Sequence, residues 1–512
     1  MKNILLTLAL FLTTLYLNAQ APTIEWQKTL GGSGGDEARP IQQTTDGGYI
    51  VAGESNSNNG DVTGNNGSSD FWVVKLDATG TITWQKALGG SGIDVAHSIQ
   101  QTIDGGYIVA GQSNSTNGDI TGNHGNYDYW VVKLDSSGVI TWQKSLGGSG
   151  WDALYSIQET TDGGYIVVGE SNSTNGDVIG NQGNADYWII KLDSIGTITW
   201  QKSLGGSGSD IGFSIQQTTD GGYVVAGQSN STNGDVTGNH GGWDYWVVKL
   251  DSLGDISWQK SLGGAGADEA RSVQQTTDGG YIITGRSTST DGDVTGNHGN
   301  YDCWMVKLDS LGAIIWQKSL GGSGADGGWV VQQTTDGGYI VAGYSNSTDG
   351  DITGNNGDYD CWAVKLDSIG AIMWQKSLGG SGLDIGYSTQ QTTDEGYIIA
   401  GYSNSTNGDV TGNQGNRDYW IVKLSPSVSV SEVSAFSEFN VYPNPTNSQV
   451  TLKVNPNLVG ALYIIYDNMG KAVMSGKINN EHTVIELDNL SNGIYLFKVG
   501  ENSKQTFKVI KN

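Results

Sequence analysis

The residues best suited to chemistry are carboxylates in a polar segment that recurs along the chain. Two copies of this segment have Asp at positions 1, 3 and 12, Thr at position 5 and Gly at position 6. The ligand candidates in these copies are Asp291, Asp293, Thr295 and Asp302, and then Asp349, Asp351, Thr353 and Asp360. Calcium prefers several oxygen ligands, and loops of the EF-hand type place them at positions 1, 3, 5 and 12 around a glycine at 6. Because position 12 is Asp rather than the bidentate Glu, and one copy has Ile179 at position 5, we expect a polar turn capped by Asp and Asn side chains. A calcium site is the alternative.

Three tryptophans form a second group of candidates, because they occur at positions where the other copies have different residues. They are Trp151, Trp243 and Trp329, next to a Gly-Ser-Gly-x-Asp turn or in the long polar loop. Indole rings combine a large apolar face with one hydrogen-bond donor, and they are common where proteins bind ligands. We expect these three residues to be candidate contacts for a glycan or a protein ligand.

These candidates are positioned by a unit of 58 residues that occurs seven times. Tryptophan recurs at this interval from Trp26 to Trp374, and a second series runs from Trp72 to Trp420. Seven copies without an insertion or deletion indicate one structural unit stacked seven times.

Each unit is expected to contain four β-strands. In the second copy, residues 98–102 alternate between polar and apolar positions, and residues 107–111 return after an Asp-Gly-Gly turn, which is a strong hairpin signal. A long polar loop then leads to a third strand over 129–134, and a tight turn leads to a fourth over 139–145. No segment of useful length has helical periodicity, so the repeat region is predicted to be all-β.

Four strands repeated seven times predict a seven-bladed β-propeller over residues 21–424. The chain opens with a fourth strand at 23–28 that has no preceding blade, and the last copy stops after a third strand at 418–424. The first strand would therefore complete the last blade and close the ring. A parallel β-helix is the structural alternative, whereas immunoglobulin-like domains need about 100 residues each.

The repeats resemble the secreted bacterial propeller repeats of the delta-60-like group. The resemblance rests on Asp-Gly-Gly-Tyr-Ile-Val-Ala-Gly at 104–111 and Tyr-Trp-Val-Val-Lys-Leu-Asp at 129–135, and it covers 23–424. It implies the propeller fold and little about activity.

The repeat argues against catalysis. An active site needs different groups that converge on one point, but this chain repeats the same carboxylate in every copy, as at Asp94, Asp152 and Asp210. No His-Glu-x-x-His or Walker motif is present. We therefore predict a non-enzyme, with a glycan-active enzyme that uses acids near a central channel as the alternative.

The start of the chain and its charge indicate where the protein works. Lys2 precedes an apolar run over 4–17 that ends in Asn-Ala-Gln, which predicts a cleaved signal peptide at 1–20. The run is too short for a membrane span, and no later stretch is long and apolar enough for one. The net charge of -26 argues against nucleic acids and anionic membranes as partners.

The composition changes after the repeats. Residues 425–438 are predicted to be a linker, and 439–512 are predicted to form a small strand-rich domain. The pattern in this domain rests on Tyr442, Pro443, Asn444 and Pro445 near its start and on Gly493, Tyr495 and Lys498 near its end. It resembles the type A C-terminal sorting domain of the type IX secretion system, a small β-sandwich. The resemblance implies an interaction with that machinery and export through the periplasm to the outer cell surface or the medium.

Together these features predict a secreted or cell-surface propeller that binds a ligand or mediates adhesion without catalysis. The alternative is a calcium-stabilised propeller that binds or cleaves carbohydrate.

Overall fold

The computed structural model describes residues 20–426, 439–467, 471–499 and 506–512. The chain divides into two compact units, 1–428 and 429–512. Nearly all of the predicted signal peptide at 1–20 and most of the predicted linker at 425–438 lie outside the described residues.

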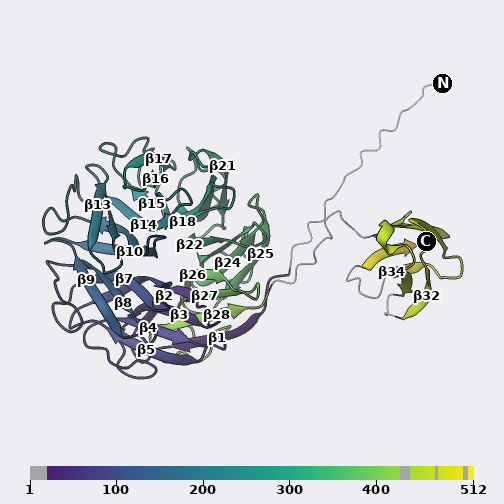
Figure 1. Cartoon of the computed structure of the whole chain (residues 1–512), viewed down its shortest axis with the longest axis horizontal. Helices are drawn as coiled ribbons and strands as arrows, with labels where there is room; N and C mark the ends of the chain where they lie inside the picture. The colour runs from purple at the N-terminus through teal and green to yellow at the C-terminus, as the bar shows by residue number, and fades with distance from the viewer. Residues whose placement is uncertain (1–19, 427–438, 468–470, 500–505) are drawn as a thin grey trace. The chain divides into compact units, whose positions relative to one another are not determined.

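The first unit is a ring of seven four-stranded antiparallel sheets, in which sequential strands lie side by side. The first strands line the centre of the ring, as Figure 1 shows for β2, β10, β14, β22 and β26. The first strands are β2 (Asp36–Gln43), β6 (Asp94–Gln101), β10 (Asp152–Glu159), β14 (Asp210–Gln217), β18 (Asp268–Gln275), β22 (Asp326–Gln333) and β26 (Asp384–Gln391). The second strands are β3 (Tyr49–Ser55), β7 (Tyr107–Ser113), β11 (Tyr165–Ser171), β15 (Tyr223–Ser229), β19 (Tyr281–Ser287), β23 (Tyr339–Ser345) and β27 (Tyr397–Ser403). The third strands are β4 (Asp70–Leu76), β8 (Asp128–Leu134), β12 (Asp186–Leu192), β16 (Asp244–Leu250), β20 (Asp302–Leu308), β24 (Asp360–Leu366) and β28 (Asp418–Leu424). The fourth strands are β5 (Ile82–Leu88), β9 (Ile140–Leu146), β13 (Ile198–Leu204), β17 (Ile256–Leu262), β21 (Ile314–Leu320), β25 (Ile372–Leu378) and, for the seventh blade, β1 (Ile24–Leu30).

The two ends of the repeat region meet in the seventh blade. β1 pairs antiparallel with β28, so that Ile24 lies opposite Leu424 and Leu30 opposite Tyr419. The indole nitrogen of Trp420 also donates a hydrogen bond of 2.9 Å to the side-chain oxygen of Gln27. The prediction of a seven-bladed propeller closed by its N-terminal strand is confirmed.

Aromatic side chains of the third strands hold neighbouring blades together. The rings of Tyr129 in β8 and Trp188 in β12 are 4.7 Å apart, centre to centre. The Tyr129 hydroxyl donates a hydrogen bond of 2.9 Å to the Trp188 carbonyl, and both side chains are fully buried. Cys303 and Cys361 occupy the tyrosine position in two blades as buried, free thiols. Buried aromatic rings contribute strongly to core stability, so these junctions fix each blade against the next.

The second unit contains two antiparallel sheets that share one apolar core. The first sheet contains β29 (Phe439–Tyr442), β30 (Gln449–Val454) and β33 (His482–Glu486). The second contains β32 (Ala472–Lys477), β31 (Leu462–Tyr466), β34 (Gly493–Val499) and β35 (Thr506–Lys511). A 3-10 turn, η1 (Pro456–Leu458), follows β30. Across the described parts of both units, no helix is long and apolar enough to cross a membrane.

Candidate functional site

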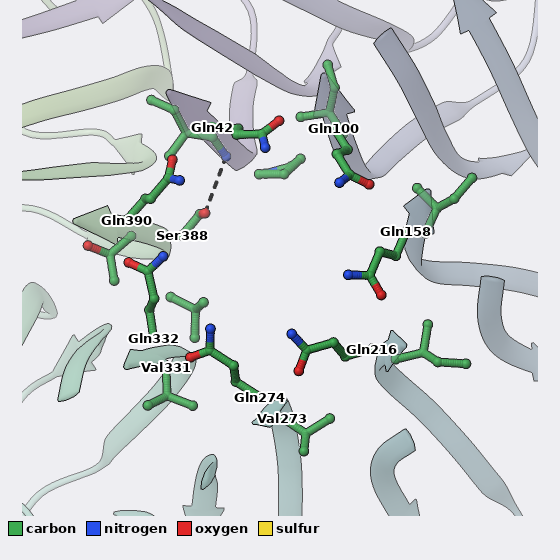
Figure 2. A pocket seen from close by; sticks show the side chains of 17 residues that line it. Gln42, Gln100, Gln158, Gln216, Val273, Gln274, Val331, Gln332, Ser388 and Gln390 are labelled. Atoms are coloured by element: carbon green, nitrogen blue, oxygen red, sulfur yellow. Dashed lines mark hydrogen bonds between the residues drawn. The ribbon is translucent and has the colours of Figure 1, made fainter. Parts of the chain in front are cut away.

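The central channel has two levels, and the level near the ends of the first strands is the same in every blade. Seven glutamine side chains surround the channel axis there, as Figure 2 shows. This glutamine ring consists of Gln42, Gln100, Gln158, Gln216, Gln274, Gln332 and Gln390. The side-chain oxygen of Gln42 accepts a hydrogen bond of 2.6 Å from the Gln101 backbone, and that of Gln390 accepts one of 2.7 Å from Gln43 across the closure. The glutamine ring therefore ties each blade to its neighbour.

The other level is formed by side chains that differ between blades. Each of these residues lies at a β-bulge in the first strand. In β10, for example, Leu154 pairs with Gly169 and Ser156 with Val168, which leaves Tyr155 without a partner on β11. Bulges bend a strand and redirect side chains. The seven residues, called here the bulge ring, are Arg39, His97, Tyr155, Phe213, Arg271, Trp329 and Tyr387, and they line a cavity of about 520 Å³.

The bulge explains a glycine in the second strand of every blade. A Cβ atom on Gly169 would overlap the backbone carbonyl oxygen of Ala153, two residues before Tyr155. The same overlap with the opposite carbonyl would occur at the equivalent glycines of the other blades. These are Gly53, Gly111, Gly227, Gly285, Gly343 and Gly401. Glycine at this position therefore allows the backbone approach that accompanies the bulge.

Members of the bulge ring stack on one another around the axis. The Arg271 guanidinium lies between two rings, 4.0 Å from the centre of Phe213 and 4.8 Å from that of Trp329. The further centre-to-centre distances are 5.1 Å for His97 and Tyr155, 4.9 Å for Tyr155 and Phe213, 5.1 Å for Trp329 and Tyr387, and 5.3 Å for Arg39 over Tyr387. Such contacts hold planar groups in fixed orientations. The cavity wall is thus built from side chains that support each other.

A smaller cavity of about 250 Å³ adjoins the bulge ring on one side. Trp329 and Tyr387 line both cavities. The other residues around the smaller one are Arg286, Tyr344, Tyr359, Leu383, Ile385 and Tyr402. The site is therefore asymmetric, because one sector of the ring has an aromatic side pocket that opens beside it.

All four arginines of the 512-residue chain lie at or beside the bulge ring: Arg39, Arg271, Arg286 and Arg417. Their counter-ions are unevenly distributed. Arg39 and Arg417 share two glutamates, since both pair with Glu37 and Arg39 also pairs with Glu54 at 3.3 Å. Arg271 and Arg286 share a single carboxylate oxygen of Glu269, at 2.6 and 2.8 Å.

The pKa values of two arginines at equivalent positions reflect this difference. Burial opposes the charge of Arg39, but Tyr387, Glu54 and Glu37 raise its pKa above the usual value. For Arg271, burial and the nearby charge of Arg286 outweigh Glu269 and lower the pKa. Burial, with a smaller effect of Arg39, also holds the pKa of His97 well below its usual range, so this ring is neutral at pH 7.

Several buried polar atoms at this level have no hydrogen-bond partner within the described part of the chain. They are Nε of Arg39 and Arg271, Nε2 of His97, Nε1 of Trp329 and Oε1 of Gln228. All five residues line the larger cavity. Buried polar groups in folded proteins are nearly always satisfied, by protein, water or ligand. The wall of the larger cavity therefore contains five residues whose polar atoms the described structure does not satisfy.

The structure separates the three predicted tryptophans. Trp329 lies in β22 as a member of the bulge ring. Trp151 lies outside the ring, where it stacks on Tyr127 of the preceding blade at 4.3 Å and bridges to its backbone. Trp243 occupies the position equivalent to Tyr127 and bridges to Ala267. Only Trp329 lines the two cavities described above.

The structure does not gather the predicted calcium ligands of one loop at one point. Asp291 and Asp293 accept hydrogen bonds from the backbone amides of Ala265 and Gly263, in the turn before β18. Asp302 accepts one from His298 and lies near Asp326 of the next blade. The second set, Asp349, Asp351, Thr353 and Asp360, follows the same arrangement. In both sets the threonine, Thr295 or Thr353, accepts a hydrogen bond from a glutamine of the fourth strand.

No group of three or more His, Cys, Asp or Glu residues that could hold a metal ion occurs within the described ranges. Calcium binding by these loops stays a prediction, which melting curves recorded with calcium and with a chelator would test.

The repeated carboxylates of the first strands are turn caps. Asp94 accepts hydrogen bonds from the Gly90 amide at 2.8 Å and from the Ser115 hydroxyl at 2.9 Å. It is fully buried at a junction between blades. These contacts agree with the structural interpretation of this residue, whose equivalents recur in every blade.

In the C-terminal unit, the predicted motif residues organise the two ends of the fold. Asn444 donates a hydrogen bond to the Lys508 carbonyl and accepts one from the Ile510 amide, both at 2.8 Å. Tyr495 is buried and donates one of 2.7 Å to the Ser491 carbonyl. Asn444 is preceded by Pro443 and Tyr442 and followed by Pro445, whereas Gly493 and Lys498 lie in β34. Asn444 thus connects the N-terminal motif to the last strand, β35, by two hydrogen bonds.

Comparison with known families identifies this second unit. Residues 440–512 match the family described as the secretion system C-terminal sorting domain. This domain directs the chain out of the cell, to the cell surface or the medium, by the type IX route.

Comparisons of the whole chain give more distant likenesses. The chain is 28% identical over 142 residues to the regulatory protein FlaEY of Caulobacter vibrioides. The matched region covers 24% of this chain and 14% of that protein. The chain therefore matches only a small part of the length of this curated relative.

Among solved structures, three further similarities were found. The WD40 domain of Pan2 from Neurospora crassa is 12% identical, with coverage of 77% of this chain and 95% of that one and a TM-score of 0.43. PorZ of Porphyromonas gingivalis, a surface component of the type IX secretion system, is 13% identical, with coverage of 94% and 60% and a TM-score of 0.41. BamB of Moraxella catarrhalis is 16% identical, with coverage of 78% and 88% and a TM-score of 0.34.

Proposed function

We propose that this chain is an exported, non-catalytic binding or adhesion propeller that takes its ligand at the bulge ring. The observation that carries the proposal is the contrast between the two levels of the channel. The glutamine ring has the same residue in every blade, as a structural role requires. The bulge ring has Arg, His, Tyr, Phe, Arg, Trp and Tyr at positions related by the repeat. A single asymmetric ligand needs such differences, because each blade presents a different group to it.

The acids at this level support binding rather than catalysis. Glycoside hydrolysis, for example, needs two free carboxyl groups on opposite sides of the bond that is cleaved. Here Glu37, Glu54 and Glu269 are paired with arginines, and Glu170 accepts a hydrogen bond of 2.9 Å from the Tyr155 hydroxyl. Their geometry orients the planar side chains of the bulge ring and the arginines beside it.

The experiment that tests this proposal is a comparison of two proteins on glycan and protein arrays. The full exported chain should bind a defined subset of the array, and the Trp329→Ala variant should lose that binding. Trp243→Ala is the matched control, because it removes the same side chain at a position outside both cavities. Equal binding by wild type and Trp329→Ala would contradict the proposal.

A further inference from the structure

The bulge ring contains one cation that its surroundings do not fully neutralise, and this feature indicates a ligand class. The inference rests on the proposed function above. On the side of the first blade, two arginines face two glutamates. On the side of the fifth, Arg271 and Arg286 share Glu269. These two arginines therefore carry one positive charge more than the glutamate that they share, in a chain whose net charge is -26.

The Arg271 side chain is held so that only part of it remains available. Its two faces are covered by Phe213 and Trp329, and its Nη2 atom donates to Glu269 at 2.6 Å. Its Nε atom has no acceptor in the described structure. Guanidinium groups bind carboxylates through two adjacent N–H donors in one plane. The Arg271 side chain is 15% exposed, and a carboxylate that pairs with its open N–H donors would compensate the surplus charge.

The remainder of the cavity wall favours a sugar over a purely apolar acid. Trp329, Tyr155 and Tyr387 line the cavity with the parts of their rings that the neighbouring side chains leave uncovered. His97, Trp329 and Gln228, each of which has an unpartnered polar atom, line the same cavity. Gln228 is only 7% exposed, so its unpaired amide oxygen is costly unless a donor reaches it. A pyranose ring presents hydroxyl donors and acceptors around its edge and C–H groups on its faces.

We propose that the bulge ring binds a sugar acid, with its carboxylate on Arg271 and its ring among Trp329, Tyr155 and Tyr387. The side pocket begins at Trp329 and Tyr387, which also line the main cavity. It is the place for a second sugar, so the ligand is the acidic end of a glycan chain rather than a free monosaccharide.

The test uses isothermal titration of the full exported chain with acidic oligosaccharides selected from the array. Each oligosaccharide is compared with its carboxyl-reduced form, and with the corresponding free sugar acid. We expect carboxyl reduction to weaken binding roughly tenfold or more, as for the loss of a charge-assisted hydrogen-bond pair. The free sugar acid should bind more weakly than the oligosaccharide, because it leaves the side pocket empty.

Two arginine variants, one inside the bulge ring and one outside both cavities, separate the role of Arg271 from a general effect of charge. Arg271→Gln should lose the preference for the acid over its reduced form, while Glu269 keeps its pairing with Arg286. Arg417→Gln is the matched control and should keep the preference, because Arg417 lines neither cavity and Glu37 retains Arg39. Melting curves establish that both variants fold. If Arg271→Gln does not, Arg271→Lys takes its place and should reduce the preference for the acid, because an ammonium lacks the two adjacent N–H donors of a guanidinium; an unchanged preference in that variant would overturn the inference.

The outcomes distinguish this inference from the proposed function. Equal affinity for acid and reduced sugar, or an unchanged preference in Arg271→Gln, would overturn the sugar-acid inference and leave binding at the ring intact. If the array shows Trp329-dependent binding only to neutral glycans or to proteins, the sugar-acid inference is likewise overturned and binding at the ring is retained. If no Trp329-dependent binding occurs at all, both proposals fail.

Discussion

The guanidinium carbon of Arg271 lies 4.0 Å from the centre of the Phe213 ring, although the two residues belong to different blades. This contact exists because each residue lies at a bulge that turns its side chain toward the channel axis. Stacking of this kind fixes both groups before any ligand arrives. A preorganised wall loses little side-chain entropy on binding, which favours affinity.

The bulges can be tested through the glycines that permit them. Gly169→Ala would place a methyl group on the Ala153 carbonyl, and we expect it to cost about 3 kcal/mol or more, since the backbone would have to move. Gly163→Ala is the control in the same blade. Gly163 has a φ of +78° and open space around it, so its cost should be about 1–2 kcal/mol. Denaturant unfolding measures both values, and an equal or reversed order would contradict this account.

Closure of the ring depends on β1. Deletion of residues 21–30 removes the outer strand of the seventh blade and leaves the Trp420 indole without its Gln27 partner. We expect the melting temperature of the propeller to fall by roughly 10 °C or more, because an entire strand pairing is lost. A calorimetric Tm within about 2 °C of wild type would show that the ring does not need this strand.

The junctions between blades make stability dependent on pH. Burial, together with the charges of Asp210 and Asp235, raises the pKa of Asp186 to about 7. Burial raises the pKa of Asp70, Asp360 and Asp418 to about 6. A carboxyl group whose pKa is raised in the folded state makes its full contribution to the free energy of unfolding below its unfolded-state pKa, near 4. That contribution is lost as the pH rises through its folded-state pKa. The neutral His97 ring makes stability depend on pH in the opposite direction, but it is a single group against the four aspartates named above.

We therefore expect Tm to decrease between pH 5 and pH 8. The variant Asp186→Asn removes one of these charges and should raise Tm at pH 8 by about 2–4 °C, with a smaller effect at pH 5. Differential scanning calorimetry in chelator-containing buffer checks both points. A Tm that rises from pH 5 to pH 8, or an Asp186→Asn variant that is less stable at pH 8, would contradict this assignment.

The sorting domain provides a separate prediction. Asn444→Ala removes two hydrogen bonds to β35, and we expect it to destabilise this domain by about 1–3 kcal/mol. We therefore expect the Asn444→Ala variant to be retained in the periplasm, as we expect for a variant that lacks residues 439–512. Cell fractionation and immunoblotting measure this. Normal export of both variants would show that the domain is not the export signal.

The architecture could be predicted from the sequence because its evidence is periodic. The 58-residue interval predicts the length of one blade. The strands at 23–28 and 418–424 predict that the two ends of the repeat region pair and close the ring. The match of the tail to a sorting domain was also visible in the residues from Tyr442 to Pro445. These features are strands and turns, which depend mainly on neighbouring residues and can therefore be predicted from the sequence.

The bulge ring could not be predicted in the same way. Arg39, His97 and Tyr155 look like random variation until the bulge shows that their side chains share one cavity. The useful signal was present, since aligning the seven copies places them in one column with Trp329. Loop spacing likewise could not show that Asp293 and Asp302 belong to different blade junctions.

A crystal structure of the chain with the strongest array ligand tests whether the ligand binds inside the bulge ring. We expect electron density for the ligand in the channel beside Arg271, Trp329 and Tyr387, continuing toward the side pocket. Density over Trp151 and Tyr127, or elsewhere on the outer surface with an empty channel, would contradict it.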